Sequence, residues 1–349
     1  MKFNVGLDSG YGYCLVKSNS KEIIVPNFIE KINEEQAEDL AKNINSLSEK
    51  SMLIKYENEY YTIGSFAVKA NSKLKRYTTN DRIGNEYHLV EILSCLGLIN
   101  NNRNFEVNLV VGLPNKLRDK KGDMVNWLTK KWKFSYLTKN GEIERVIDIR
   151  ECGCVEQCLV AIYELSQDQI EELSILSIDV GQNTGDACVV SEGIPSINVT
   201  DWANFDGIKL CYENLKSKLV KSFQSQFNIY DVYDKDLQTA IETGILKVKN
   251  TKIDIADILH EVFDEYAEYV FLEIEDKYSD TLSNVDYTIA SGGIFCSDYF
   301  SQKLANKFSK YKITFAKFEN PQHSVVNGMY NLSNILFDDD SKDDEVNEK

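Results

Sequence analysis

Several features that define large protein classes are missing from this sequence of 349 residues. No apolar stretch reaches the roughly 18 residues that a membrane-spanning helix requires. The first residues, 1–12, alternate like a strand and lack the basic and then apolar layout of a signal peptide. These absences predict a cytoplasmic protein that makes no contact with a membrane.

Positive charge is also scarce. The chain has 39 Lys and Arg residues against 55 Asp and Glu residues, which gives a net charge of −16. We find no strong local basic patch, and an acidic chain without one is repelled by nucleic acid. The charge balance therefore disfavours direct nucleic-acid binding. It favours solubility, or a partner that carries the positive charge.

Histidine is rare, with three residues scattered along the chain, whereas cysteine occurs eight times. Cys152, Cys154 and Cys158 form a C-x-C-x3-C cluster. A structural zinc site usually has four ligands, often from two C-x2-C pairs, and no second pair is present. We therefore favour reduced thiols over a metal site. No local signature supports Ser-His-Asp or Cys-His catalysis.

What the sequence does contain is strands alternating with helices, in two halves, which indicates an α/β protein of two or three domains. We expect domain I at 1–165, completed by a C-terminal helix at 321–337. Domain II is expected at 166–320, with a helical insertion at about 210–280. The charged run at 338–349 is expected to be a disordered acidic tail.

Helical spacing of apolar residues places most of the helices. We expect them at 84–98, 119–131, 154–165, 210–227, 253–274, 296–308 and 325–337. The segment 34–46 reads as a surface helix or an inserted loop.

The two halves share a motif, which indicates an internal duplication. Apolar residues run into Asp8, then any residue, then Gly10; the same order recurs at Asp179 and Gly181. A second strand of similar length follows each turn. One such hairpin is a weak signal, because Asp and Gly are common in turns. Two at equivalent places in two α/β halves point to a shared role.

Facing glycine turns suit a polyphosphate. Glycine exposes consecutive backbone N–H groups without a Cβ in the way, and a concave set of such groups binds phosphate oxygens. Asp8 and Asp179 would then hold Mg²⁺ through its water shell. The alternative is that both carboxylates merely cap their turns.

A third glycine motif, S-G-G-I, follows the short strand at 287–290 and precedes a helix. Without Cβ atoms, a flat base can lie against this backbone, and the following helix start favours a nearby anion. The motif therefore suits the adenosine end of a nucleotide.

With these motifs in order, D-x-G-Y-G, D-x-G-x4-D and S-G-G-I, the chain resembles the actin-like ATPase superfamily. The run V-N-G-M-Y at 326–330 narrows the resemblance to bacterial plasmid-segregation actins of the ParM type, at about residues 3–335. The resemblance implies a duplicated, ribonuclease H-like two-domain fold with ATP or GTP and Mg²⁺ in the interdomain cleft. It also implies nucleotide-dependent filaments that hydrolyse ATP and segregate plasmid DNA through a small basic DNA-binding adaptor.

The resemblance also assigns roles to single residues. Glu156 would position the attacking water, with Glu151 as its competitor and a solvated helix-start carboxylate as the alternative for either. Many members carry a phosphate-binding Lys where this chain has Leu15; either Lys17 replaces it from a longer reach, or the contact is absent. The expected nucleotide-binding residues are Asp8, Ser9, Gly10, Tyr11, Gly12, Lys17, Gly181, Gln182, Asn183, Thr184, Gly207, Ser291, Gly292, Gly293 and Ile294, with Asp179 catalytic alongside Glu156.

Other functions of the same fold stay open. A small-molecule kinase would need an acceptor pocket with a catalytic Asp, and we see no kinase-specific motif. A chaperone-like ATPase would need a substrate-binding domain after residue 337. A cell-shape actin usually carries an apolar tip that binds membrane, and neither end of the sequence supplies one.

Overall fold

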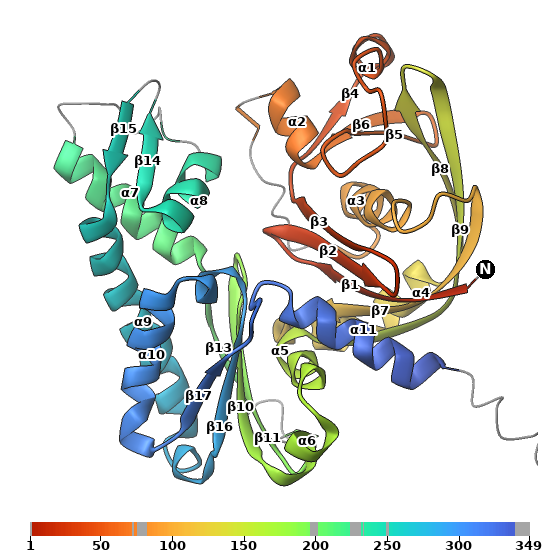
Figure 1. The fold of residues 1–349 in the computed structure, drawn as a ribbon. Coiled ribbons are helices and arrows are strands. Elements are labelled where there is room, and N and C mark those ends of the chain that lie inside the picture. The colour runs from red at the N-terminus through yellow and green to blue at the C-terminus, as the bar shows by residue number, and fades with distance from the viewer. Residues whose placement is uncertain are drawn as a thin grey trace, which may run out of the picture.

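Two β-sheets lie side by side in the computed structural model and divide the chain into two bodies (Figure 1). The structure describes residues 2–71, 73–74, 82–195, 202–223, 232, 234–248 and 251–338. Within these residues the first sheet has nine strands and the second has six. The expected acidic tail lies outside the described residues except for Asp338.

The first sheet has the order β3-β2-β1-β7-β9-β8-β5-β6-β4. Its strands are β1 (Lys2–Ser9), β2 (Tyr13–Ser18), β3 (Glu22–Pro26), β4 (Ile29–Ile32), β5 (Met52–Tyr56), β6 (Glu59–Ile63), β7 (Asn104–Leu113), β8 (Lys131–Thr138) and β9 (Gly141–Glu156). The helices here are α1 (Glu34–Ala41), α2 (Gly64–Ala70), α3 (Glu86–Leu96) and α4 (Lys121–Leu128), preceded by the 3₁₀ turn η1 (Asn115–Lys120). The sheet curls around α3, whose residues from His88 to Leu96 are all buried (Figure 1).

The second sheet has the order β12-β11-β10-β16-β17, with β13 paired to β11. Its strands are β10 (Ser174–Val180), β11 (Thr184–Ser191), β12 (Ile194–Pro195), β13 (Ala203–Asp206), β16 (Tyr287–Ser291) and β17 (Thr314–Lys317). The long helices α9 (Ala256–Tyr278) and α10 (Asp298–Phe308) cover one face, and α5 (Gln157–Val160) and α6 (Gln167–Glu172) lie toward the other (Figure 1). α7 (Lys209–Phe223), α8 (Asp234–Thr243) and the hairpin of β14 (Ile245–Val248) and β15 (Thr251–Asp254) form an arm.

Side-chain alternation along β10 explains why both faces of this sheet are covered. Leu176, Ile178 and Val180 pack into the core formed with α7, α9 and α10. Ile175 packs on the opposite face, with α5 and α6. Successive residues of a strand point to opposite faces, so an uninterrupted apolar strand requires cover on both.

The duplication expected from the sequence is present in the strand pairing. β1 pairs antiparallel with β2, with Asp8 opposite Leu15, and parallel with β7. β10 pairs antiparallel with β11, with Asp179 opposite Asp186, and parallel with β16. Each predicted Asp therefore lies at the turn end of the first strand of an equivalent hairpin. This pairing shows the two related α/β halves that the sequence predicted.

The last helix, α11 (Ser324–Phe337), returns from the second sheet and packs beneath β1 and β7 of the first (Figure 1). Glycines allow α11 to approach its neighbours closely. A Cβ on Gly6 of β1 would meet the backbone of Val326 and Tyr330 in α11. A Cβ on Gly328 of α11 would meet the Val160 carbonyl. The V-N-G-M-Y run thus has a packing function at its glycine.

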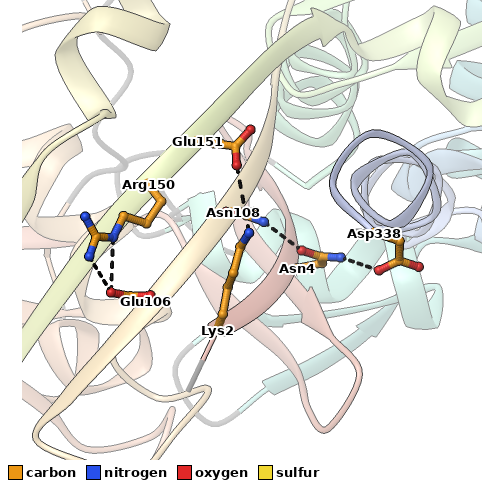
Figure 2. A network of polar contacts seen from close by, with 7 residues as sticks. All are labelled: Lys2, Asn4, Glu106, Asn108, Arg150, Glu151 and Asp338. Carbon is orange, nitrogen blue, oxygen red and sulfur yellow. Dashed lines mark hydrogen bonds and ion pairs between the residues drawn. The ribbon is translucent and has the colours of Figure 1, made fainter. Parts of the chain in front are cut away.

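Polar contacts fix the end of α11 to the first sheet (Figure 2). The Asn108 side chain donates to Asn4, and Asn4 donates to Asp338 at 2.9 Å. Nearby, Lys2 pairs with Glu151 and Arg150 pairs with Glu106. The C-terminal helix and the N-terminal strand are therefore held together although they are at opposite ends of the chain.

Two helix predictions were wrong at their starts. The helix expected from residue 154 begins at Gln157, because β9 stays paired with β7 as far as Leu113 opposite Glu156. The helix expected from residue 253 begins at Ala256, because β15 takes the preceding residues into a hairpin with β14. In both places a tertiary strand pairing overrides the local helical pattern. Among the described residues, no helix combines the length and apolarity that crossing a bilayer requires.

The close contact at Gly328 leads to a stability prediction. We expect Gly328→Ala to lower the free energy of unfolding by about 1–3 kcal/mol, because the added methyl would collide with the Val160 backbone. Gly122→Ala, in α4, is the control: nothing lies within 4 Å of its added Cβ. That change should be neutral or stabilise by up to ~1 kcal/mol. Urea denaturation of both variants makes the comparison, and equal effects would contradict the packing role.

Candidate functional site

A cavity of about 350 Å³ lies between the two sheets and is lined from both. The first hairpin contributes Asp8 and the turn from Gly10 to Gly12, and the second contributes the run from Asp179 to Gln182 together with Thr184. The third motif contributes Gly292, Gly293 and Ile294. The three predicted motifs therefore meet at one site, although they are far apart in the sequence.

Asp8 is enclosed at the end of β1. Its Oδ1 accepts a hydrogen bond of 2.6 Å from Gln157 Nε2. Burial raises the pKa of Asp8 to about 6, against the opposing effects of that hydrogen bond and of the Arg82 charge.

Asp179 is enclosed in the same way at the end of β10. Its Oδ1 accepts a hydrogen bond of 2.7 Å from Ser291 Oγ, so the third motif supports the second. Burial raises the pKa of Asp179 to about 8, and the negative charges of Asp8 and Asp186 raise it further. The two predicted carboxylates are therefore close enough to interact across the cavity.

The turn of the second hairpin is held by the start of α7. Gly181 N donates to Thr184 O at 2.9 Å, and Gly207 N donates to Asn183 O at 3.1 Å. A Cβ on Gly207 would overlap the backbone of Gly181 and Thr184. Gly207 therefore supports the predicted turn from behind and does not line the cavity. Asn183 lines a neighbouring cavity, which shares Thr184 with this one.

The third turn packs on the end of β10. Gly292 has a φ of +108°, and a Cβ there would meet the Val180 carbonyl. Ser291 is buried behind it. The cavity also has apolar and aromatic side chains in its lining, namely Ile208, Tyr212, Ile241 and Ile294.

The lining thus combines apolar side chains with carboxylates and glycine turns. Such a combination suits a ligand with a flat apolar group and a charged tail. The donor set also fits a magnesium ion, because Asp8 and Asp179 supply the carboxylate oxygens that Mg²⁺ prefers.

Glu156 does not face this cavity. It ends β9, and its Oε2 accepts from Lys121 Nζ at 2.5 Å. The next residue, Gln157, lines the cavity and contacts Asp8. Glu151, the competitor, is largely exposed and pairs with Lys2 at the other end of the sheet (Figure 2). The sequence predicted a helix at Glu156, whereas β9 continues through this residue and α5 begins at Gln157.

Lys17 is also turned away from the cavity. Its Nζ donates to Asn327 Oδ1 of α11 at 2.5 Å, and it lies over the Tyr330 ring. Leu15, two residues earlier on β2, lines the cavity with an apolar side chain. The expected replacement of a phosphate-binding Lys by Lys17 has no support in this arrangement.

Arg82 was missed by the sequence reasoning. It lines the cavity, is 4% exposed, and donates to the Ser9 carbonyl. No motif surrounds it in the sequence, because it lies in the loop before α3. Arg82 reaches the cavity only because the folded chain brings that loop into contact with the first hairpin.

A further contact missed at the sequence level joins the two sheets. Asn115 follows β7, and its backbone N–H donates to Asp186 Oδ2 at 3.3 Å. Its side chain donates to Asn204 of β13 at 3.0 Å. The end of β7 therefore contacts the second hairpin beside the cavity.

The cysteine cluster is spread over two elements. Cys152 and Cys154 are half-buried on β9, whereas Cys158 is buried in α5 with its Sγ 3.6 Å from Cys188 Sγ. Within the described ranges, no group of three or more His, Cys, Asp or Glu side chains has a geometry that could hold a metal ion.

Two family models match the chain. Residues 6–159 match the N-terminal domain of actin-like proteins, and residues 177–304 match the C-terminal domain of archaeal MreB-like actin homologues. No curated protein sequence is a significant match.

Solved structures of actin homologues match over nearly the full length. The actin-like protein Alp7A has a TM-score of 0.75 at 15% identity, over 96% of this chain and 97% of its own. A 15-stranded ParM filament from Clostridium botulinum has a TM-score of 0.73 at 18% identity, over 96% and 99%. The archaeal actin homologue Ta0583, in complex with ADP, has a TM-score of 0.74 at 17% identity, over 95% and 99%.

The loop that carries Arg82 is fixed by a buried histidine, which yields a pH prediction. His88 Nδ1 contacts the Arg82 carbonyl at 3.0 Å, and its ring lies against Trp127. Burial, together with the Arg82 charge, lowers the pKa of His88 to about 3. Between pH 6.5 and 3 the folded protein therefore binds fewer protons at His88 than the unfolded chain, so the stability contributed by neutral His88 is lost as pH falls.

We expect the wild-type advantage over His88→Gln to shrink by about 1–2 kcal/mol between pH 7 and pH 5. Gln keeps a donor for the Arg82 carbonyl but does not titrate. Urea denaturation of both proteins at the two pH values measures the difference. A constant difference would show that His88 does not resist protonation.

Proposed function

Because this chain belongs to the actin-like proteins, we propose that it is a filament-forming ATPase or GTPase that segregates plasmid DNA. The observation that carries the proposal is the pair of glycine hairpins, whose Asp8 and Asp179 line one cavity. A triphosphate fits between them, with its base toward Ile208, Tyr212 and Ile294. The likeness to actin homologues supports the same site.

The hairpin turns bind the phosphates through backbone N–H groups, from Ser9 to Gly12 and from Gln182 to Thr184, because the Gly181 N–H already donates to Thr184 O. Asp8 and Asp179 would hold Mg²⁺ through its bound waters. That ion, when bound, neutralises the charge that develops on the transferred phosphoryl group. With a cation present, both carboxylates are favoured in the ionised form despite their burial.

Gln157 orients the attacking water. It reaches the cavity wall from the start of α5, and its contact with Asp8 fixes the side chain. An amide supplies both a donor and an acceptor, so it positions a water without acting as a strong base. Glu156 supports this position by its ion pair with Lys121.

Filament formation requires a head-to-tail contact between copies that does not close into a ring. Hydrolysis changes the contacts across the cavity, and the two sheets then move relative to one another. In this way the nucleotide state controls the affinity between subunits. An acidic filament would bind a small basic DNA-binding adaptor by charge complementarity, which links it to plasmid DNA.

Sedimentation and phosphate release together test the function. With ATP or GTP and Mg²⁺, the wild type should pellet and release phosphate without any acceptor. Asp179→Asn should bind nucleotide at least about 10-fold more weakly in Mg²⁺, because it loses a charge but keeps an oxygen for Ser291. Asp168→Asn, on the exposed face of α6, is the control and should behave as wild type. A protein that stays in the supernatant and consumes ATP only with an added acceptor would instead be a small-molecule kinase.

The position of Gln157 gives a second prediction. Gln157→Ala should slow phosphate release by about 10- to 100-fold, because positioning of the water is lost, while assembly with the triphosphate persists. Glu156→Gln should have a smaller effect, since that side chain faces Lys121 and not the cavity. Single-turnover phosphate release distinguishes the two. A large effect at Glu156 and none at Gln157 would return the role to the residue expected from the sequence.

A further inference from the structure

The charges that line the cavity do not match a polyphosphate ligand. Asp8 and Asp179 are both acidic, and the triphosphate that we propose adds several negative charges of its own. Among the lining residues that the structure describes, Arg82 is the one Lys or Arg. Leu15 lines the cavity without a charge, and Lys17 is bound to Asn327. Any cation that the chain itself supplies at this wall therefore comes from Arg82.

Arg82 is held in place from both sides. Its guanidinium donates to the Ser9 carbonyl, and its Cζ lies 3.7 Å from the centroid of the Tyr11 ring. Its own carbonyl is contacted by His88 Nδ1 at 3.0 Å and accepts from Asn85 N at 3.3 Å. With 4% exposure the side chain is immobilised against the first glycine turn.

The chemistry of the group suits phosphate. A guanidinium carries five N–H donors in a planar fork that matches the oxygens of a phosphate, and it stays charged when buried. One donor bound to Ser9 leaves the fork able to donate to a ligand on the same side. An ionic hydrogen bond in a buried site is stronger than one at the surface, because water competes less.

We propose that Arg82 binds the terminal phosphates of the nucleotide and holds them against the turn of the first hairpin. This assignment depends on the proposed nucleotide function. Stacking on Tyr11 keeps the guanidinium beside the turn. Arg82 thus distinguishes nucleotides by the number of their phosphates, whereas the apolar side chains of the lining contact the base.

The rival explanation is structural: Arg82 merely clamps the hairpin and balances the charge of Asp8. If Arg82 is only a clamp, its loss would weaken the binding of every ligand of the cavity equally. If Arg82 binds phosphate, its loss would weaken each ligand's binding according to the number of phosphates that the ligand carries. The two explanations therefore differ in the pattern of affinities.

Titration calorimetry in Mg²⁺ with adenosine, AMP, ADP and a non-hydrolysable ATP analogue, below the assembly concentration, measures this pattern. We expect Arg82→Gln to weaken the binding of the triphosphate analogue by about 10- to 100-fold and the binding of ADP by less. The affinity for adenosine should not change. Arg145→Gln is the matched control, because Arg145 is also 4% exposed, donates to the Gly97 carbonyl and lies near the Tyr136 ring. It should leave all four affinities unchanged.

A gain-of-function variant adds a second test. Leu15→Lys places an amine at the same wall, so combining it with Arg82→Gln should restore at least about a tenth of the lost triphosphate affinity. If Arg82→Gln does not fold, Arg82→Lys replaces it. That variant should show a smaller loss, confined to ADP and the triphosphate analogue.

Equal weakening of all ligands by Arg82→Gln, or unchanged triphosphate affinity in the folded variant, would overturn the assignment. Failure of the wild type to bind any of the four ligands or their guanine counterparts would instead overturn the proposed function. The two failures are therefore distinguishable.

Discussion

Two aspartates, each at the end of a buried strand, face one cavity from two separate sheets. The charge of Asp8 raises the pKa of Asp179, so neither carboxylate is independent of the other. Burial of two acids side by side is costly unless a cation or a proton compensates them. The site is consequently organised around that need: Ser291 and Gln157 donate to the carboxylates, and Arg82 places a positive charge beside the first turn.

The turns around these aspartates are rigid because their neighbours hold them by the backbone. The start of α7 bonds to the second turn, and Gly207 permits the contact because any Cβ would overlap that turn. Arg82 and Asn27 hold carbonyls of the first turn. A phosphate site made from backbone amides requires this support, since main-chain groups bind well only when their directions are fixed. The glycines supply the space, and the elements behind them supply the rigidity.

The helix α11 links the chain ends and the two bodies. It leaves β17 of the second sheet, passes the cavity at Val325, and packs beneath β1 and β7 of the first (Figure 1). It also binds Lys17 through Asn327 and is fixed at its end by Asn4 (Figure 2). A movement of one sheet relative to the other would therefore act on this helix. Its packing against β1 and against the end of α5 explains why glycines occur at positions 6 and 328.

The sequence alone determined the two hairpins, the α/β class and the third glycine turn, because Asp, Gly and apolar runs act locally through turn geometry and strand burial. The repeat and the third glycine motif also predicted that Asp8, Asp179 and the turn at Gly292 lie at one cavity, which all three line. Tertiary structure decided the rest. β9 continues to Glu156 because β7 is there to pair with it, which turns Gln157 toward the cavity. Lys17 donates to Asn327 of α11 and does not line the cavity, whereas Arg82, in the loop before α3, lines it and donates to the Ser9 carbonyl. Contacts between segments so distant in the sequence leave no local pattern to read.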